Sequence, residues 1–527
     1  MRKAGFLSKV TGSAMVFFLL AANLAAAAPS EAKEGKEHSF LVGLTPGVAA
    51  KALDAPGIQM KDRWDDLNVV QIVASEAAIK GLEHNPNISY IEEDRTVYAS
   101  SLGTNYTDGA LTWGLQAVNA EQAWSQNATG QNIKVCVLDS GIDYDHPEFT
   151  RDGVSVIKAS KNFVNDGHPD ATDGAGHGTH VAGTIVGQTS NSGSRIGVAP
   201  DVDLYVARVL GDDGSGSTSG IINALSWCQQ NNANIASLSL GSSRSSRTEK
   251  AAFDKAYQNG MLSIAASGND GGAIGYPANY SSVVAVGAVD SSLNLASFSN
   301  YGKNQEVVAP GVATLSSIPR GTGIQSSAKE TENGVDTSFS SVPLEFSGQG
   351  EVTGALVDSG LGDSADAFSG KPASGPWVAL INRGSISFAE KIQNAVAQGA
   401  SAVIIANNDT ANPDDPGSFT LGSEGNWVPV VSVSYNSGNS IRSNGLGTGS
   451  VNVSSWDYSY FQGTSMATPH VSAVAALAWS ANPQLTNEQI RNILQSTAVD
   501  LGTAGRDSSF GFGLVQADAA VQKARNF

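Results

Sequence analysis

Apolar runs and amphipathic segments alternate through the middle of the chain. Apolar runs of strand length predict buried strands at residues 133–138, 204–209, 235–240, 261–266, 283–289 and 306–309. Helices are predicted between them, at residues 177–187, 220–230 and 248–259. Buried strands that alternate with helices are typical of a parallel sheet covered on both faces, so the pattern predicts an α/β fold. Such sheets place their chemistry on loops at the carboxyl ends of the strands.

The segment before this pattern predicts a small α+β unit with helices on one face of a sheet. Its predicted elements are a strand at 39–44, a helix at 48–53, a strand at 68–74, a helix at 76–85 and a strand at 88–92. A polar stretch rich in Gly and Ser, residues 100–109, predicts a linker after it.

A second change of character occurs between residues 320 and 456, where Gly, Ser and Asn become more frequent. Its ordered part predicts a strand near residue 376, a helix at 388–398 and strands at 402–406 and 427–433. This mixed segment of about 130 residues is long enough for its own core, so it predicts an inserted domain. Two further helices are predicted after it, at 465–479 and 486–495.

The N-terminus predicts an export signal. Arg2, Lys3 and Lys9 precede an apolar run at 14–24, and Ala25-Ala26-Ala27 offers a cleavage site that would leave Ala28 first. The alternative, a membrane anchor, is disfavoured because the run is short and ends in small residues. No later run is long and apolar enough to span a bilayer, so no stable membrane anchor is expected.

Composition narrows the choice of partners. The chain has 31 Lys and Arg against 49 Asp and Glu, a net charge of −18, which argues against nucleic acid or an anionic membrane. The 58 glycines fit a soluble, flexible protein, and a cold or a saline habitat would both account for the composition. Cys136 and Cys228 can form a disulfide in an exported protein or can be two small buried residues; both alternatives are open.

The candidate chemistry centres on Ser465, which lies where the glycine-containing stretch 463–470 becomes a helix. Free N–H groups and the helix dipole at that position would stabilise an oxyanion, but a serine hydroxyl also needs a base and an orienting acid. Asp139 follows a buried strand and His177 opens a helix of small residues. Asn269 follows another strand and can donate its amide N–H to the oxyanion.

Four motifs carry a resemblance to the subtilisin family (subtilases) of secreted serine proteases. They are Asp139-Ser-Gly-Ile-Asp, His177-Gly-Thr-His-Val-Ala-Gly-Thr, Ala266-Ser-Gly-Asn269 and Gly463-Thr-Ser465-Met-Ala-Thr-Pro-His, in the triad order of subtilisin. The resemblance covers about residues 113–319 and 458–522. It implies a three-layer fold with a mostly parallel sheet, and hydrolysis of peptide bonds through an acyl-enzyme. His180 would be a structural hydrogen bonder, and no organic cofactor is expected.

The resemblance also implies a domain organisation. It assigns residues 1–27 to a signal peptide, 28–101 to an inhibitory propeptide removed by self-cleavage, and 102–527 to the catalytic domain. The insert at 322–456 resembles a mainly-β protease-associated (PA) domain, which would affect substrate access or be passive. The expected partners are polypeptide substrates and the chain's own propeptide, and the expected mature form is a secreted monomer.

The resemblance further implies a substrate cleft and a structural calcium ion. The implied cleft residues are Ser239, Leu240, Gly241, Gly214, Ser215 and Gly216, with Gly275 at the base of a pocket for a large apolar side chain. Glu148 aligns with a calcium ligand of the family that is usually Asp, and the loop 188–195 departs from the family's pattern. Asp166, Asp170 and Asp173 would form either an oxygen-rich metal site or a solvated acidic loop.

Two other function classes compete with this interpretation. A non-catalytic binding protein could keep the fold, but the presence of all the catalytic residue types argues against it. An esterase of the α/β-hydrolase class is disfavoured because Ala467 replaces the last glycine of a Gly-x-Ser-x-Gly elbow. Asp358 and Ser364 lie in sequences that imitate catalytic motifs, but no matching histidine follows, so both are predicted to be surface positions.

Overall fold

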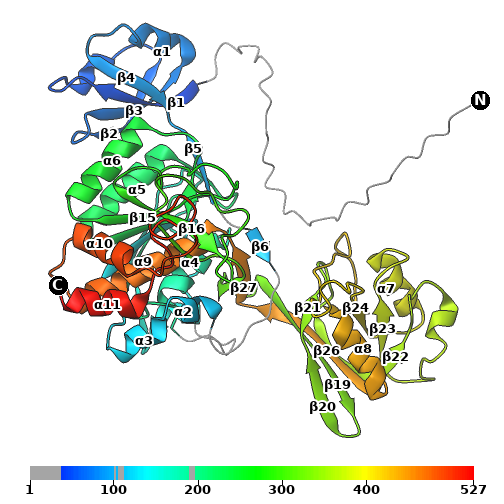
Figure 1. The fold of residues 1–527 in the computed structure, drawn as a ribbon. Coiled ribbons are helices and arrows are strands. Elements are labelled where there is room, and N and C mark those ends of the chain that lie inside the picture. Colours follow the sequence, from blue (N-terminus) through cyan, green and yellow to red (C-terminus); the bar gives the residue numbers. More distant parts are fainter. Residues whose placement is uncertain (1–36, 100–101, 105–111, 189–195) are drawn as a thin grey trace, which may run out of the picture. The chain divides into compact units, whose positions relative to one another are not determined.

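The computed structural model describes residues 37–99, 102–104, 112–188 and 196–527, which form two compact units (Figure 1). One unit, which we call the insert, is Gln325–Ser454. The other contains an N-terminal module (residues 37–99) and a main module (residues 112–324 and 455–527). The predicted signal peptide, most of the predicted linker and most of the loop 188–195 lie outside the described residues.

The main module is built on a seven-stranded sheet in the order β10-β11-β7-β13-β15-β16-β17, in which every neighbouring pair is parallel. The strands are β7 (Lys134–Asp139), β10 (Ile157–Asn162), β11 (Asp203–Arg208), β13 (Ile235–Leu238), β15 (Leu262–Ala266), β16 (Val283–Val289) and β17 (Val307–Pro310). The predicted parallel α/β sheet is therefore confirmed. A short hairpin, β8 (Thr150–Arg151) with β9 (Val154–Ser155), precedes β10.

Helices cover both faces of this sheet, because successive strand residues point into different cores. Val135 and Val137 of β7 pack with α4 and α9, whereas Cys136 and Leu138 pack with α5 and α6. The helices are α2 (Trp113–Ala117), α3 (Ala120–Ser125), α4 (His177–Val186), α5 (Thr218–Gln230), α6 (Arg247–Gln258), α9 (Thr464–Ala481), α10 (Asn487–Thr497) and α11 (Ala517–Arg525). This gives the expected three-layer architecture, with α9 running through the larger core.

Cys136 and Cys228 form a disulfide that joins β7 to α5 across 92 residues of sequence. Both cysteines are fully buried. The structure thus decides between the two alternatives that the sequence left open, and a disulfide is typical of a protein that folds in an oxidising compartment.

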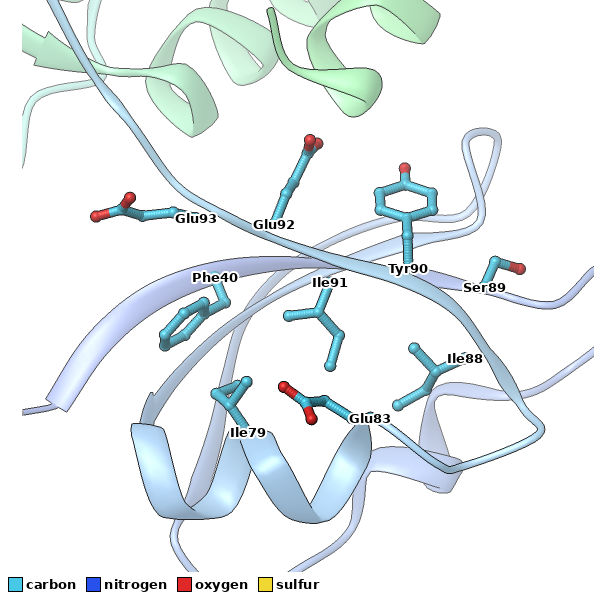
Figure 2. Close-up of a pocket in the computed structure, with 9 residues that line it drawn as sticks. All are labelled: Phe40, Ile79, Glu83, Ile88, Ser89, Tyr90, Ile91, Glu92 and Glu93. Carbon is cyan, nitrogen blue, oxygen red and sulfur yellow. The ribbon is translucent and has the colours of Figure 1, made fainter. Parts of the chain in front are cut away.

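The N-terminal module is a four-stranded antiparallel sheet in the order β2-β3-β1-β4 with one α-helix on it. Its elements are β1 (Glu37–Leu44), β2 (Ile58–Trp64), β3 (Val69–Ser75), α1 (Glu76–Leu82) and β4 (Ile88–Glu93). Strand β2 was not predicted, because most of its side chains are polar and exposed. The helix expected at 48–53 is only a short 3₁₀ turn, Ala50–Leu53. A pocket of about 290 Å³ lies between β4 and α1 (Figure 2).

The insert is an eight-stranded sheet in the order β20-β19-β26-β22-β23-β24-β25-β21 with two α-helices. The strands are β19 (Gly323–Glu332), β20 (Val335–Phe339), β21 (Ser341–Pro343), β22 (Gly350–Asp358), β23 (Trp377–Asn382), β24 (Ala402–Ala406), β25 (Val430–Val433) and β26 (Thr448–Trp456); the helices are α7 (Phe388–Ala397) and α8 (Tyr435–Asn444). Strands β22 to β25 are parallel, whereas the pairs β19–β20, β21–β25 and β22–β26 are antiparallel. Asp358 pairs with Arg442 at the surface, and Ser364 is exposed.

No helix among the described residues is both long enough and apolar enough to cross a membrane.

Candidate active site

Ser465 is the second residue of α9, which begins after Gly463 and is buried over most of its length. Pro469 lies four residues further on and has no N–H with which to bond the Ser465 carbonyl. The hydroxyl of Ser239, at the end of β13, takes that place and donates to the Ser465 carbonyl at 2.7 Å. Because Pro469 cannot bond it, the Ser465 carbonyl is available to Ser239, and this hydrogen bond links the start of α9 to the sheet.

The hydroxyl of Ser465 donates to the carbonyl oxygen of Ser239 at 2.8 Å. Within the described part of the chain, Nε2 of His177 has no hydrogen-bond partner. The Ser465 hydroxyl is thus held against the backbone, and it would have to rotate before it could give its proton to the imidazole. Longer catalytic hydrogen bonds are common in proteins without substrate, so this geometry does not argue against catalysis.

Asp139 and His177 form a buried pair. Asp139 ends β7 and accepts the Nδ1 hydrogen of His177 at 2.6 Å, while its own carboxylate is fixed by the Ser140 N–H at 2.7 Å. Burial alone would lower the pKa of His177, but the charge and hydrogen bond of Asp139, with the charge of Asp173, raise it. With Nδ1 bonded to the carboxylate, Nε2 is left to exchange a proton with a nucleophile.

Asp173 holds the start of α4 in place. Its two oxygens accept hydrogen bonds from the backbone N–H groups of Ala175, Gly176 and Thr179 and from the hydroxyls of Ser140 and Thr179. This buried carboxylate therefore links the loop after Asp139 to the helix that carries His177. Sequence reasoning considered it only as a metal ligand or as part of a solvated acidic loop. Its position four residues before His177, at a helix start, was the signal for a positioning role.

Asn269 lies on the loop after β15 and faces the start of α9. Its side-chain oxygen accepts the Thr464 N–H and the Thr464 hydroxyl, both at 2.9 Å. Asn300 supports this loop, since its side chain bonds the backbone of Ser267, Asp270, Gly272 and Ala273.

If Asn269 has the predicted role, replacing it with Ala is expected to lower kcat by about 10²–10³, the loss typical of removing one oxyanion-hole donor, with little change in KM. The reason is that a donor in this role bonds the oxyanion only in the transition state. Steady-state kinetics on a peptide substrate measures the effect, and Asn304→Ala, on an exposed loop, is the control. A large rise in KM with unchanged kcat would contradict the role.

His180 and His470 are structural. One ring nitrogen of His180 bonds the carbonyls of Thr314 and Ser459, and its ring stacks on Phe461. Burial lowers the pKa of His180 to about 3 and that of His470 to about 4, so both stay neutral. His180 therefore behaves as a structural hydrogen bonder, one turn after His177.

An extended segment of the chain itself lies beside Ser239. Strand β5 (Thr96–Ala99) is the middle strand of a three-stranded antiparallel sheet, between β12 (Ser215–Ser217) and β14 (Leu240–Gly241). The Ala99 N–H donates to the Gly214 carbonyl at 3.0 Å. The structure thus brings the predicted cleft segments 214–216 and 239–241 to the two sides of one extended peptide. Val97 is fully buried there, and Tyr98 is half exposed.

A second short sheet contains the strand that precedes Ser465 in the sequence. Strand β6 (Leu102–Thr104) pairs antiparallel with β27 (Tyr458–Gln462), which also pairs with β18 (Thr314–Ser317). Strand β27 ends three residues before Ser465. Strand β5 thus pairs with the segment that follows Ser239, and β6 pairs with the strand that precedes Ser465 in the sequence.

Comparison with known proteins decides the family. The profile of the subtilase family (Peptidase_S8) matches residues 130–342 and 377–513, which is more than half of the chain. This chain belongs to the subtilase family. Subtilase relatives include alkaline elastase YaB of Bacillus sp. (strain YaB), 30% identical over 97% of this chain and 98% of the relative, and subtilisin NAT of Bacillus subtilis subsp. natto, 36% identical over 58% and 80%.

A solved subtilase structure agrees with this assignment. The psychrophilic subtilisin-like protease Apa1 from the Antarctic psychrotroph Pseudoalteromonas sp. AS-11 is 33% identical, with a TM-score of 0.57 over 78% of this chain and 98% of that one. The chain is therefore a serine-type endopeptidase of the subtilisin type, as its sequence predicted.

The predicted metal residues of this subtilase have protein partners. Asp166 pairs with the buried Arg208 at 2.6 Å, and Asp170 accepts the Thr172 hydroxyl and N–H. Among the residues that the structure describes, no three or more His, Cys, Asp or Glu are grouped to hold a metal ion. Because these carboxylates neutralise Arg208 or close a local turn, the acidic-loop alternative fits Asp166 and Asp170 better than a metal site.

Glu148 and Gly275 stay predictions in this subtilase. Glu148 is buried and accepts the Tyr458 hydroxyl at 2.8 Å, and residues 189–195 of the expected calcium loop lie outside the described chain. Gly275 permits a close backbone approach, since a Cβ there would lie 3.0 Å from the Ser242 carbonyl oxygen. Such a close approach of two backbone segments is compatible with the predicted place of Gly275 at the base of a pocket.

Proposed function

We propose that this subtilase is an exported endopeptidase in which Asp139, His177 and Ser465 act as a catalytic triad. The observation that carries the proposal is the buried 2.6 Å hydrogen bond from His177 to Asp139, on a helix that shares its core with the helix that carries Ser465. Export is supported by the N-terminal sequence and by the disulfide.

In the proposed reaction, the Ser465 hydroxyl leaves the Ser239 carbonyl and turns to Nε2 of His177. As Oγ attacks the peptide carbonyl, the imidazole takes its proton, and Asp139 stabilises the imidazolium. The carbonyl oxygen becomes an oxyanion, which the Asn269 amide and the Ser465 N–H stabilise. Collapse breaks the C–N bond, and His177 gives the proton to the leaving amine. Water then hydrolyses the acyl-enzyme by the same steps, which restores Ser465.

We also propose that residues 28–101 are a propeptide that the enzyme removes itself. Strands β5 and β6 support this proposal, because β5 pairs with both predicted cleft segments as an extended substrate would, and β6 pairs with β27, which ends three residues before Ser465. The bond cut would then lie between Ala99 and Leu102. The remaining parts of the proposal are a PA-type insert, a structural calcium ion at Glu148 and a monomeric mature enzyme.

The test is active-site labelling of the secreted form. A fluorophosphonate probe should modify Ser465. The untreated enzyme should cleave casein and a blocked peptide, and the probe should inhibit both activities at similar concentrations. Absence of both labelling and hydrolysis would favour the non-catalytic binding protein. Cleavage of small esters but not of proteins would favour the esterase. Mass spectrometry of the labelled chain also gives its N-terminus and so tests the proposed cut.

A further inference from the structure

The contact between the N-terminal module and the main module places acidic groups at the starts of two helices. Asp94 accepts the N–H and hydroxyl of Ser219 at the start of α5. Glu92 accepts the N–H groups of Arg247 and Thr248 and the hydroxyl of Ser246 at the start of α6. Figure 2 shows Tyr90 and Glu92 on the face of β4 turned toward the main module, opposite Ile88 and Ile91. Docking therefore depends on carboxylates that receive N–H groups at helix N-termini.

Of these two contacts, only the one at the start of α6 has a second acidic residue close to it. Glu249, the third residue of α6, is almost completely buried, and its Oε1 has no hydrogen-bond partner among the described residues. The Tyr280 hydroxyl lies 2.8 Å from its Oε2. The charged or titratable groups that act on Glu249 are Glu92 and Arg95 of the N-terminal module and Tyr280 of the main module. On α6 itself, Arg247 stacks on the Tyr90 ring.

The Tyr280 hydroxyl has two acceptors and only one hydrogen. It lies 2.9 Å from the Ser246 carbonyl as well as 2.8 Å from Glu249, and it accepts the Ser246 N–H at 2.9 Å. A protonated Glu249 can donate to Tyr280, which leaves the Tyr280 hydrogen for the Ser246 carbonyl. An ionised Glu249 takes that hydrogen and leaves the carbonyl without it. Ionisation therefore disturbs the residue that caps α6 and contacts Glu92, and it adds a like charge near Glu92.

We propose that Glu249 is a pH-sensitive latch that holds the N-terminal module in acid and loosens it as the pH rises. The proposal rests on the proposed role of this module as a propeptide. Burial is the largest cause that raises the pKa of Glu249 to about 7; Tyr280 and Arg95 oppose it, and the Glu92 charge adds to it. Undocking removes both Glu92 and Arg95, and Glu92 has the larger effect of the two, so the pKa of Glu249 falls when the module leaves.

The direction of the effect follows from this difference in pKa. The docked form binds the proton more tightly than the undocked form, so docking is strongest at pH values below the undocked pKa. It weakens as the pH rises and reaches its minimum above the docked pKa of about 7. After self-cleavage, release would therefore be slow in acid and faster at neutral pH.

Hydrogen exchange on the full-length Ser465→Ala chain tests the latch without any hydrolysis. The amides of Arg247 and Thr248 donate to Glu92, so their protection, corrected for the intrinsic rate at each pH, reports docking. Between pH 5 and 8 we expect their protection to fall about tenfold or more, since one unit of pKa difference corresponds to a factor of ten. Because hydrolysis is not needed, the result is independent of the proposed catalytic triad.

Three variants of this chain make the test specific. With Glu249→Gln, protection should stay high at all pH values, and with Glu92→Gln it should be low with a smaller pH slope. Asp94→Asn is the matched control, because it weakens the contact at α5 and should keep the slope at α6. A flat profile in the parent chain, or an unchanged slope in Glu249→Gln, would overturn the proposal. If Glu249→Gln does not fold, the Glu92→Gln variant is the test. A pH slope of protection in Glu92→Gln equal to that of the parent chain would then overturn the proposal.

Discussion

Replacing Ser465 with Ala is expected to abolish peptide hydrolysis, with a loss in kcat of about 10⁶, the size known for the same replacement in subtilisin. The alanine has no group that can form the acyl bond, so the other catalytic groups can only assist a slow attack by water. The same variant should keep residues 28–101 attached if the chain processes itself. Chromogenic peptide kinetics and mass spectrometry of the secreted product measure the two effects.

The matched control is Ser472→Ala on the same helix. Ser472 is equally buried, but its hydroxyl bonds the Ser237 hydroxyl at 2.9 Å and lies seven residues beyond Ser465. This variant should mature and hydrolyse peptides at close to the parent rate. If Ser465→Ala still released its N-terminal module unaided and digested casein, the assignment of the nucleophile would be wrong.

The sequence predicted the buried part of the fold best. Strands β7, β11, β15 and β24 lie within two residues of their predicted positions, because a strand buried on both faces must be apolar throughout. Strands such as β2 and β19 were missed, since their side chains are largely polar or exposed and their pairing partners stabilise them. Such strands depend on contacts between distant segments, which no local pattern reveals.

The candidate site likewise contains residues that the sequence indicates and residues that only the structure reveals. Asp139, His177, Asn269 and Ser465 lie in recognisable motifs, whereas the supporting contacts of Asp173, Asn300 and Ser239 require distances across the chain. Arg208 is an instructive case. It ends an apolar strand next to β7, and a buried guanidinium needs carboxylate partners.

The need of a buried arginine for carboxylate partners would have indicated that two nearby acids form ion pairs with Arg208. Asp166 and Asp212 both pair with Arg208, at 2.6 and 2.8 Å. Sequence reasoning left Asp166 either in a metal site or in a solvated acidic loop, because it considered the acidic residues alone, without asking which cation they neutralise. A charged residue inside an apolar run therefore indicates that residues of opposite charge must lie near it in the fold.

The second large effect is expected from Asp139→Asn, which should lower kcat/KM by about 10⁴ while the fold is kept. An asparagine can present its NH₂ group to Nδ1 of His177, which favours the tautomer with hydrogen on Nε2, where it cannot accept the proton of Ser465. The loss therefore falls on proton transfer, and peptide binding should change little. Kinetics on a chromogenic peptide, with Asp145→Asn on the exposed part of the same loop as control, measures it.

The pH profile distinguishes this role from a merely structural one. His177 must be neutral to accept a proton, and Asp139 raises its pKa, so the parent enzyme should lose activity as the pH falls through that raised value. In Asp139→Asn the burial of the ring is no longer opposed by the adjacent charge, so the pKa of His177 falls. The acid limb of kcat/KM against pH should then move to lower pH, although the rate is far smaller. A variant that loses activity but keeps the parent's acid limb would show that Asp139 supports the fold and does not act on His177.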